Sequence, residues 1–177
     1  QSLGYLLRAF LSKLTCKRAQ QIRVVSNKML VRLVEDWKLP PEKISVVPVP
    51  VDFDRNNSLS REASKNNLVP GLGNFPTVLF VGRFYAPKNL KLWVETAAAI
   101  TKLNPTVRFI IAGDGEEKIT LLELLKKHSL SEKTILTGFV NRNKLPDLYN
   151  CGDVVLLTSS HEAFGLVVVE SLLSQTP

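Results

Sequence analysis

Four short apolar runs alternate with four amphipathic segments between residues 75 and 177, and this alternation restricts the fold more than any other feature. The runs are nearly continuous in Val, Leu, Ile and Phe, which is typical of parallel strands covered on both faces. Strands that alternate with helices predict an α/β fold with a parallel, doubly wound sheet and right-handed crossovers. The expected strands are 77–83, 107–115, 133–140 and 153–160, and the expected helices are 89–104, 116–130, 142–151 and 164–173.

The composition changes between residues 52 and 74, where Asn, Ser and Gly replace the apolar runs. These residue types favour turns and loops, so we expect a linker there. The expected organisation is therefore the end of a first domain at 1–51, a linker at 52–74 and a second domain at 75–177. The chain begins without Met and stops just after a helical pattern, and we therefore expect it to be a piece of a longer protein, incomplete at both ends.

The segment before the linker has its own strand and helix patterns. Residues 22–27 and 43–52 are predicted strands on either side of a helix at 28–38, which the prolines at 40 and 41 end. Residues 3–18 are apolar at helical spacing with basic residues between. Such a helix usually packs on its own domain, and a helix lying on a membrane surface is the alternative.

A formal net charge of +7 favours anionic ligands such as nucleotide phosphates, a nucleic acid or an acidic membrane surface. The basic residues are dispersed and only 7% of the chain is aromatic, so a nucleic-acid partner is not expected. Cys16 and Cys151 lack the spacing of metal ligands, which indicates reduced thiols in a cytoplasmic protein. No apolar run reaches the ~20 residues that a membrane-spanning helix needs.

The loops that follow the expected strands are the place to look for a site, because ligands of such sheets bind beyond the carboxyl ends of the strands. The loop after the first strand carries Arg83 and Lys88, a planar fork and a compact charge that together suit a diphosphate. Two solvated loop charges are the alternative. In "GDGEE" the acids at a helix start are explained by the helix dipole alone.

The loop "SSHEAFGLVVVE" places Glu162 and Glu170 eight residues apart. On one straight helix they would point about 80° apart. If Glu162 precedes the helix and Glu170 lies within it, both can face one crevice, and the amides near Phe164, Gly165 and Leu166 form a phosphate site. The alternative is a helix-start acid and a solvent-facing charge. His161 is most simply a loop residue.

Taken in order, four stretches resemble the C-terminal half of the retaining glycosyltransferases of family 4, the group 1 glycosyltransferases with the GT-B fold. The resemblance covers roughly residues 20–177, with Asn89 where Gly is common. The stretches are VPVPVD (47–52), which looks like the hinge before the second domain, FVGRFYAPKN (80–89), FIIAGDGEE (109–117) and residues 136–173, which contain the two glutamates with seven residues between them.

This resemblance implies a parallel Rossmann-like sheet of GT-B type and a transferase, of hexosyltransferase type, that would be inactive as an isolated piece. Arg83 and Lys88 would bind the donor's diphosphate, in place of a metal ion. Glu162 would contact the donor sugar and Glu170 the ribose hydroxyls. The loop at Gly82 and the backbone of Phe164, Gly165 and Leu166 would hold the phosphates, and Phe139 and Val140 would flank the base.

The expected reaction moves a sugar from a nucleoside-diphosphate sugar to a glycan, glycolipid or lipid-linked acceptor in polysaccharide biosynthesis, without a protein nucleophile. No cofactor and no metal is expected. The expected location is the cytoplasm, at the inner membrane face through peripheral association. A sugar-nucleotide epimerase of the same fold and a non-catalytic nucleotide-binding domain are the competing hypotheses.

Overall fold

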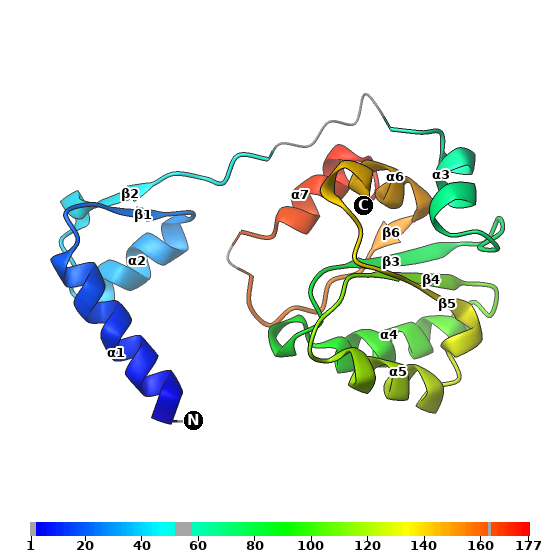
Figure 1. Cartoon of the computed structure of the whole chain (residues 1–177), viewed down its shortest axis with the longest axis horizontal. Helices are drawn as coiled ribbons and strands as arrows, with labels where there is room; N and C mark the ends of the chain where they lie inside the picture. The colour runs from blue at the N-terminus through cyan, green and yellow to red at the C-terminus, as the bar shows by residue number, and fades with distance from the viewer. Residues whose placement is uncertain (1–2, 52–57, 163) are drawn as a thin grey trace. The chain divides into compact units, whose positions relative to one another are not determined.

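The structure is a computed structural model of the chain, and it describes residues 3–51, 58–162 and 164–177. The chain forms two compact units, Gln1–Pro50 and Val51–Pro177, which are drawn in Figure 1 and are described separately below. Asp52, which the sequence places at a hinge, lies outside the described residues. None of the described helices is both long and apolar enough to cross a bilayer.

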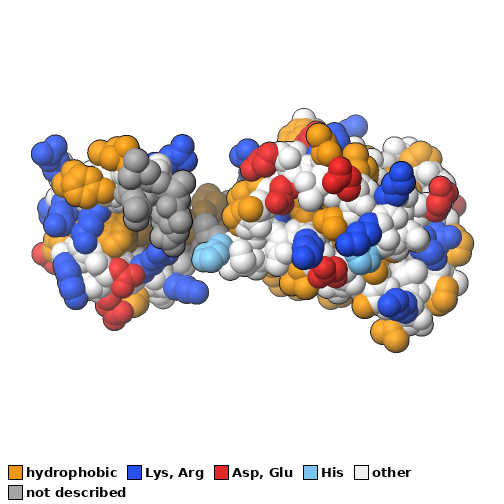
Figure 2. All heavy atoms as spheres, turned by 90° about the horizontal axis from the view of Figure 1, so that it is seen from below, with side chains coloured by type: hydrophobic (Ala, Val, Ile, Leu, Met, Phe, Trp, Pro, Cys, Tyr) orange, Lys and Arg blue, Asp and Glu red, His pale blue; other side chains and the backbone are white. Residues whose placement is uncertain are grey.

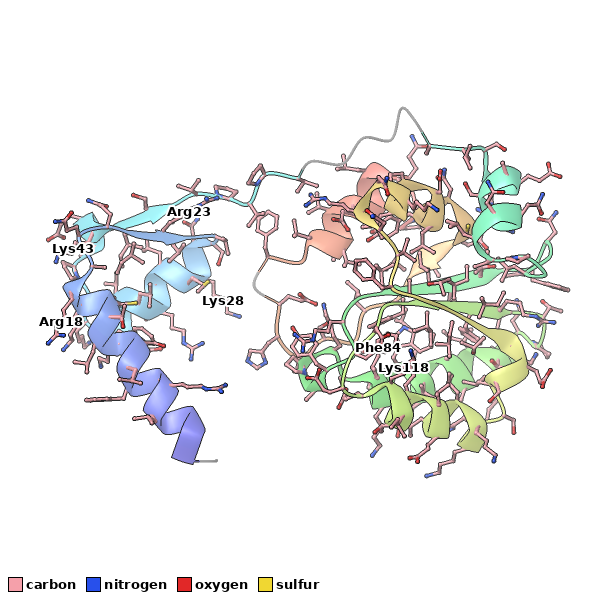
Figure 3. All side chains as sticks on the ribbon, viewed as in Figure 1. Arg18, Arg23, Lys28, Lys43, Phe84 and Lys118 are labelled. Atoms are coloured by element: carbon pink, nitrogen blue, oxygen red, sulfur yellow. The ribbon has the colours of Figure 1, made fainter. Side chains whose placement is uncertain are left out.

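The first unit pairs two short parallel strands, β1 (Ile22–Val24) and β2 (Ile44–Val46), with Ile22 opposite Ile44. Helix α1 (Leu3–Arg18) has the predicted bounds. Helix α2 (Asn27–Glu35) is capped by Ser26, whose hydroxyl accepts a hydrogen bond from the Met29 amide. Both strands are shorter than predicted. The prolines after β2 lack the N–H groups that would extend its ladder. Instead Arg23, labelled in Figure 3, donates to the Val47 and Pro48 carbonyls.

The second unit is built on a four-stranded, fully parallel sheet with strand order β5-β4-β3-β6. Its strands are shorter than the predicted runs, and β3, β4 and β5 end at or just before a glycine, at Gly82, Gly113 and Gly138. They are β3 (Thr77–Val81), β4 (Arg108–Ala112), β5 (Thr134–Gly138) and β6 (Val154–Val155). The predicted parallel α/β class is therefore confirmed.

Helices cover both faces of this sheet, as Figure 1 shows. Helices α4 (Leu90–Leu103) and α5 (Lys118–Lys127) lie on one face, and α3 (Arg61–Leu68), α6 (Leu145–Cys151) and α7 (Leu166–Leu173) on the other. Successive strand residues alternate between these layers, so Phe80 faces α4 while Leu79 faces α6. Short 3-10 turns precede four elements, at Pro41–Lys43, Ala86–Lys88, Ser131–Lys133 and Arg142–Lys144.

Helix α3 lies within residues 52–74, where a linker was predicted, so that prediction is corrected. Ser60 caps this helix through its hydroxyl and the Ala63 amide, and Val69 and Leu72 behind it are buried in the core beside α6. The Asn- and Ser-rich composition concealed the helix because only its far end contributes apolar side chains to the core. Residues 61–74 are thus part of the second unit.

The segment just before α3 is fastened to α6 and its following turn by polar contacts. The Leu59 amide donates to Asp147 Oδ1 (2.7 Å), and Asn150 Nδ2 donates to the Leu59 carbonyl (3.1 Å). Arg61 forms an ion pair with Asp153 (2.6 Å), whose other oxygen accepts a hydrogen bond from the Thr77 amide. These contacts fix the start of α3 against the edge of the sheet.

Beyond the strands, the loops continue to pair through their backbones. The Gly82 amide donates to the Ala112 carbonyl, the Gly113 amide to the Gly138 carbonyl and the Phe84 amide to the Asp114 carbonyl, at 2.8–3.0 Å. Phe84 is buried beneath this junction, near the start of α5 (Figure 3). A Cβ on Gly113 would lie 1.9 Å from the Gly82 carbonyl oxygen, so the close approach of these loops requires glycine there.

We expect Gly113→Ala to destabilise the protein by about 3 kcal/mol or more, because it combines a positive φ of 142° with a backbone clash that cannot relax. Gly71→Ala is the matched control, since Gly71 has a φ of 88° with open space around it, and should cost only about 1–2 kcal/mol. Urea unfolding of both variants measures the difference. Equal losses would show that the loops separate freely.

Candidate functional site

An open cavity of about 600 Å³ lies where strands β3, β4 and β5 end and α7 begins. This is the place that parallel α/β sheets offer to ligands. Its walls come from the last residues of β3 and β4, from the loops after the three strands, and from α6 and α7. They comprise Val81, Gly82, Arg83, Ala112, Gly113, Asp114, Gly115, Phe139, Val140, Leu145, Leu166, Val167 and Glu170.

Arg83 lies on the cavity wall with its guanidinium near solvent. Its Nη2 is 3.2 Å from Glu116 Oε2, and its Cζ lies 5.8 Å from the ring centroid of Tyr85. Both side chains of the ion pair are more than half exposed, so this contact is weak and easily exchanged for another anion. Arg83 is thus available to a ligand in the cavity.

Lys88 is buried, unlike Arg83, and its Nζ pairs with Glu162 Oε1 at 2.5 Å. Its loop is held in place from both sides. Asn89 adopts a left-handed conformation with a φ of 50°, which Asn tolerates in place of Gly, and its side chain caps α4. Thr158 donates its hydroxyl to the Lys88 carbonyl (3.0 Å), so the loops after β3 and β6 are bound together.

The pKa of Glu162 is the outcome of opposing effects. Partial burial raises this pKa, but the hydrogen bond from Lys88, the nearby Ser159 hydroxyl and the positive charge of Lys88 lower it, and the net pKa lies below the ordinary value. Ser159 acts by proximity here, because its buried Oγ has no hydrogen-bond partner among the residues that the structure describes. Glu162 is therefore an ionised carboxylate at neutral pH.

Helix α7 begins at Leu166, immediately after Gly165, whose φ of 74° favours glycine. Glu162 consequently precedes the helix, as predicted from the geometry of the two glutamates. The Val168 amide already donates to the Gly165 carbonyl (2.9 Å), so the preceding amides form the positive end of the helix. Leu166 and Val167, at this end of the helix, line the cavity.

Glu170 lies on the second turn of α7 and lines the cavity although only 6% of it is exposed. The Tyr149 hydroxyl, from α6, donates to Glu170 Oε2 at 2.9 Å. Burial raises the pKa of Tyr149, and the charge of Glu170 and this hydrogen bond raise it further. The phenol therefore keeps its proton and serves as the donor. The predicted alternative, a solvent-facing Glu170, is wrong.

The structure gathers most of the predicted site residues. Around the cavity lie Gly82, Arg83, Phe139, Val140, Leu166 and Glu170. Lys88 and Glu162 form the ion pair behind Gly82, where an added Cβ would lie 3.3 Å from Lys88 Cε. Phe164 and Gly165 lie just before the wall but are not part of it.

The sequence pattern did not indicate the part that Tyr149 plays. Nor did it place Asp114, Leu145 or Val167 in the site, although all three line the cavity. The helical spacing of residues 142–151 did predict that one face of α6 is buried. Nothing in that pattern showed that Glu170 would lie opposite the Tyr149 hydroxyl.

Within the described ranges, no group of three His, Cys, Asp or Glu side chains is placed to hold a metal ion. On the face drawn in Figure 2, Lys and Arg side chains of the second unit are mixed with Asp and Glu and do not gather into one basic patch. The positive groups at the cavity are therefore local. Arg83 and the start of α7 lie on its wall, and Lys88 lies behind Gly82 in its pair with Glu162.

Comparison with known proteins identifies the class to which this fold and site belong. Residues 64–177, more than half of the chain, match the family of "Glycosyl transferases group 1", and the chain belongs to this family. The parallel α/β fold is of the GT-B type found in such enzymes.

Individual relatives are similar over most of the chain. The alpha-D-kanosaminyltransferase of Streptomyces kanamyceticus is 34% identical over 163 residues, which are 91% of this chain and 42% of the relative. The crystal structure of WaaG, a glycosyltransferase involved in lipopolysaccharide biosynthesis, has a TM-score of 0.84 at 18% identity, covering 99% of this chain and 48% of that one. The crystal structure of Anabaena Alr3699/HepE in complex with UDP and glucose has a TM-score of 0.81 at 22% identity, covering 94% of this chain and 46% of that one.

We expect the Lys88–Glu162 pair to stabilise the protein only above acidic pH. The pKa of Glu162 is lowered on folding, so its contribution is present above the ordinary value of 4.5 and is lost as the pH falls through the folded pKa. The difference in unfolding free energy between the wild type and Glu162→Gln should therefore shrink as the pH is lowered through and below 4.5, which chemical denaturation at a series of pH values measures.

Glu95→Gln is the matched control, because its surface pair with Lys91 on the same unit spans 4.0 Å and is largely exposed. Its effect should be small and nearly independent of pH. A stability difference for Glu162→Gln that is equally flat would show that the short ion pair contributes nothing.

Proposed function

We propose that the protein is a retaining glycosyltransferase of family 4 that transfers a hexosyl group from a nucleoside-diphosphate sugar to a glycan, glycolipid or lipid-linked acceptor. The chain spans less than half of the length of the kanosaminyltransferase, WaaG and HepE, so the activity is proposed for the whole protein. The observation that carries the proposal is one cavity that combines a positive region, made by Arg83 on its wall, the start of α7 and Lys88 behind Gly82, with the buried carboxylate of Glu170.

The positive region would bind the diphosphate. Arg83 offers a planar fork on the cavity wall, Lys88 a compact charge behind Gly82, and the start of α7 its unpaired amides. As the sugar–phosphate bond breaks, negative charge develops on the departing diphosphate, and fixed positive groups stabilise that charge. These groups would take the role of a metal ion, and no cofactor is proposed.

The two glutamates would bind the ends of the donor. Glu170, buried at the cavity wall, would accept hydrogen bonds from the ribose hydroxyls, with Phe139 and Val140 beside the base. Glu162, on the loop before α7, would contact the sugar. An ion pair with Lys88 makes Glu162 a poor nucleophile, because the bond to Lys88 and its charge lower the pKa of the carboxyl.

The reaction then needs no covalent intermediate. The acceptor hydroxyl forms the new bond to the anomeric carbon on the face from which the diphosphate leaves. The bond to the diphosphate oxygen breaks, and that oxygen takes the acceptor's proton. The anomeric configuration is retained. The similarity to HepE, which was crystallised in complex with UDP and glucose, supports a nucleoside-diphosphate sugar as donor.

We further propose that the reaction takes place in the cytoplasm, at the inner membrane face where the acceptor is lipid-linked. The free thiols of Cys16 and Cys151 are consistent with a reducing compartment.

The experiment that tests this function uses the full-length protein. Calorimetry with UDP, GDP, ADP and TDP should find micromolar binding of at least one, and Arg83→Ala should weaken it by about tenfold or more. Lys88→Ala should lower kcat of sugar transfer by about 100-fold, since it removes charge stabilisation of the leaving group. Lys91→Ala, which removes an exposed lysine of α4, is the matched control and should change neither quantity.

Binding that is equal in wild type and Arg83→Ala would remove the diphosphate role. Epimerised donor formed without acceptor would support the epimerase hypothesis, and binding without any turnover would support a non-catalytic domain. NMR of the transferred linkage decides between retention and inversion of the anomeric centre.

A further inference from the structure

The Tyr149 hydroxyl lies behind the cavity wall and is not part of it. Tyr149 is fully buried and does not line the cavity, whereas Glu170, its partner on the neighbouring helix, does. Their hydrogen bond of 2.9 Å joins α6 to α7 across 21 residues of sequence. A carboxylate this deeply buried needs donors that compensate for lost water, and the phenol supplies one from the side that faces away from the ligand.

Both partners are held by the chain that follows α7. Thr176 donates its hydroxyl to the Tyr149 carbonyl (3.0 Å), and the Ser174 amide donates to the Glu170 carbonyl (3.0 Å). The backbones that carry the phenol and the carboxylate are therefore fixed relative to each other. The Tyr149 bond then restricts the rotation of the Glu170 carboxylate, which would otherwise have to be ordered when a ligand binds.

We propose that Tyr149 is a positioning residue that aims the Glu170 carboxylate at the ribose hydroxyls of the donor nucleotide. This inference rests on the proposed function. The bond to Tyr149 uses one of the roughly four acceptor sites of the carboxylate and leaves others for hydroxyl donors. The phenol keeps its proton because burial and the charge of Glu170 raise its pKa, so it donates at every physiological pH.

The consequence is a selective one. Loss of the Tyr149 hydroxyl should weaken binding only of ligands that use Glu170 through their ribose hydroxyls. If Tyr149 only fills the core, loss of its hydroxyl should instead weaken the binding of all nucleotides equally, or lower the stability of the protein alone. Nucleotides with and without the ribose hydroxyls thus separate a positioning role from a packing role.

The test compares the nucleoside diphosphate that the wild-type, full-length protein binds most tightly with its 2′,3′-dideoxy analogue, by calorimetry. Tyr149→Phe should weaken binding of the ribonucleotide roughly tenfold and leave that of the dideoxy analogue within about twofold. In a Glu170→Ala background, Tyr149→Phe should have no further effect on either ligand, because the carboxylate that it positions is absent.

Thr77→Val is the matched control, since it removes a buried hydroxyl that donates to the Phe75 carbonyl at the start of β3, the end of the strand away from the cavity. It should lower the melting temperature but keep the ratio of the two affinities. If Tyr149→Phe does not fold, difluorotyrosine at position 149 keeps the ring and changes the acidity of the hydroxyl. The affinity ratio should then change for a positioning hydroxyl and stay the same for a packing one.

Equal weakening of both ligands by Tyr149→Phe, or a loss that persists in the Glu170→Ala background, overturns the positioning role while the proposed function stands. Failure of the wild type to bind any of the four nucleoside diphosphates overturns both. A ribose-selective loss that is absent in the double variant supports the inference.

Discussion

The backbone pairing of successive strand-end loops is the constraint on which the rest of the site depends. Strands β3, β4 and β5 do not simply end, since their loops remain joined through Gly82, Gly113 and Gly138 for one more residue. A side chain on Gly113 would separate them. Because the loops remain in contact, Arg83, Asp114 and Phe139 are brought from three distant stretches of sequence to one cavity.

Arg83, Lys88 and Glu170 differ in their burial and in the partners of their charges. Arg83 stays near solvent in a weak ion pair, Lys88 is buried against Glu162, and Glu170 is buried against a neutral phenol. An exposed cation can exchange its partner at little cost, whereas a buried one must be paired at all times. The cavity therefore combines one adaptable charge with groups that are already in place before a ligand arrives.

The sequence predicted the class of fold and the alternation of strands and helices in the second unit, because apolar runs and helical spacing record burial directly. It predicted that Glu162 precedes α7 because the angle between two side chains on a helix is fixed. It missed α3, whose Asn- and Ser-rich turns resemble a linker and whose burial depends on contacts with α6. The Tyr149–Glu170 bond could not be predicted either, since it depends on how two helices pack.

The polar contacts before α3 also bear on where the second unit can be separated from the rest of the protein. The family match starts at residue 64, in the middle of α3, but Leu59, Ser60 and Arg61 supply the cap of that helix and the partners of Asp147 and Asp153. A recombinant piece cut at the family boundary would lose these contacts, so that Asp147 loses the Leu59 amide and Asp153 keeps the Thr77 amide but loses Arg61. Expression boundaries or domain exchanges with relatives are better drawn ahead of Ser58, so that the seven-residue α6 keeps the hydrogen bond from Asn150 to the Ser58 hydroxyl.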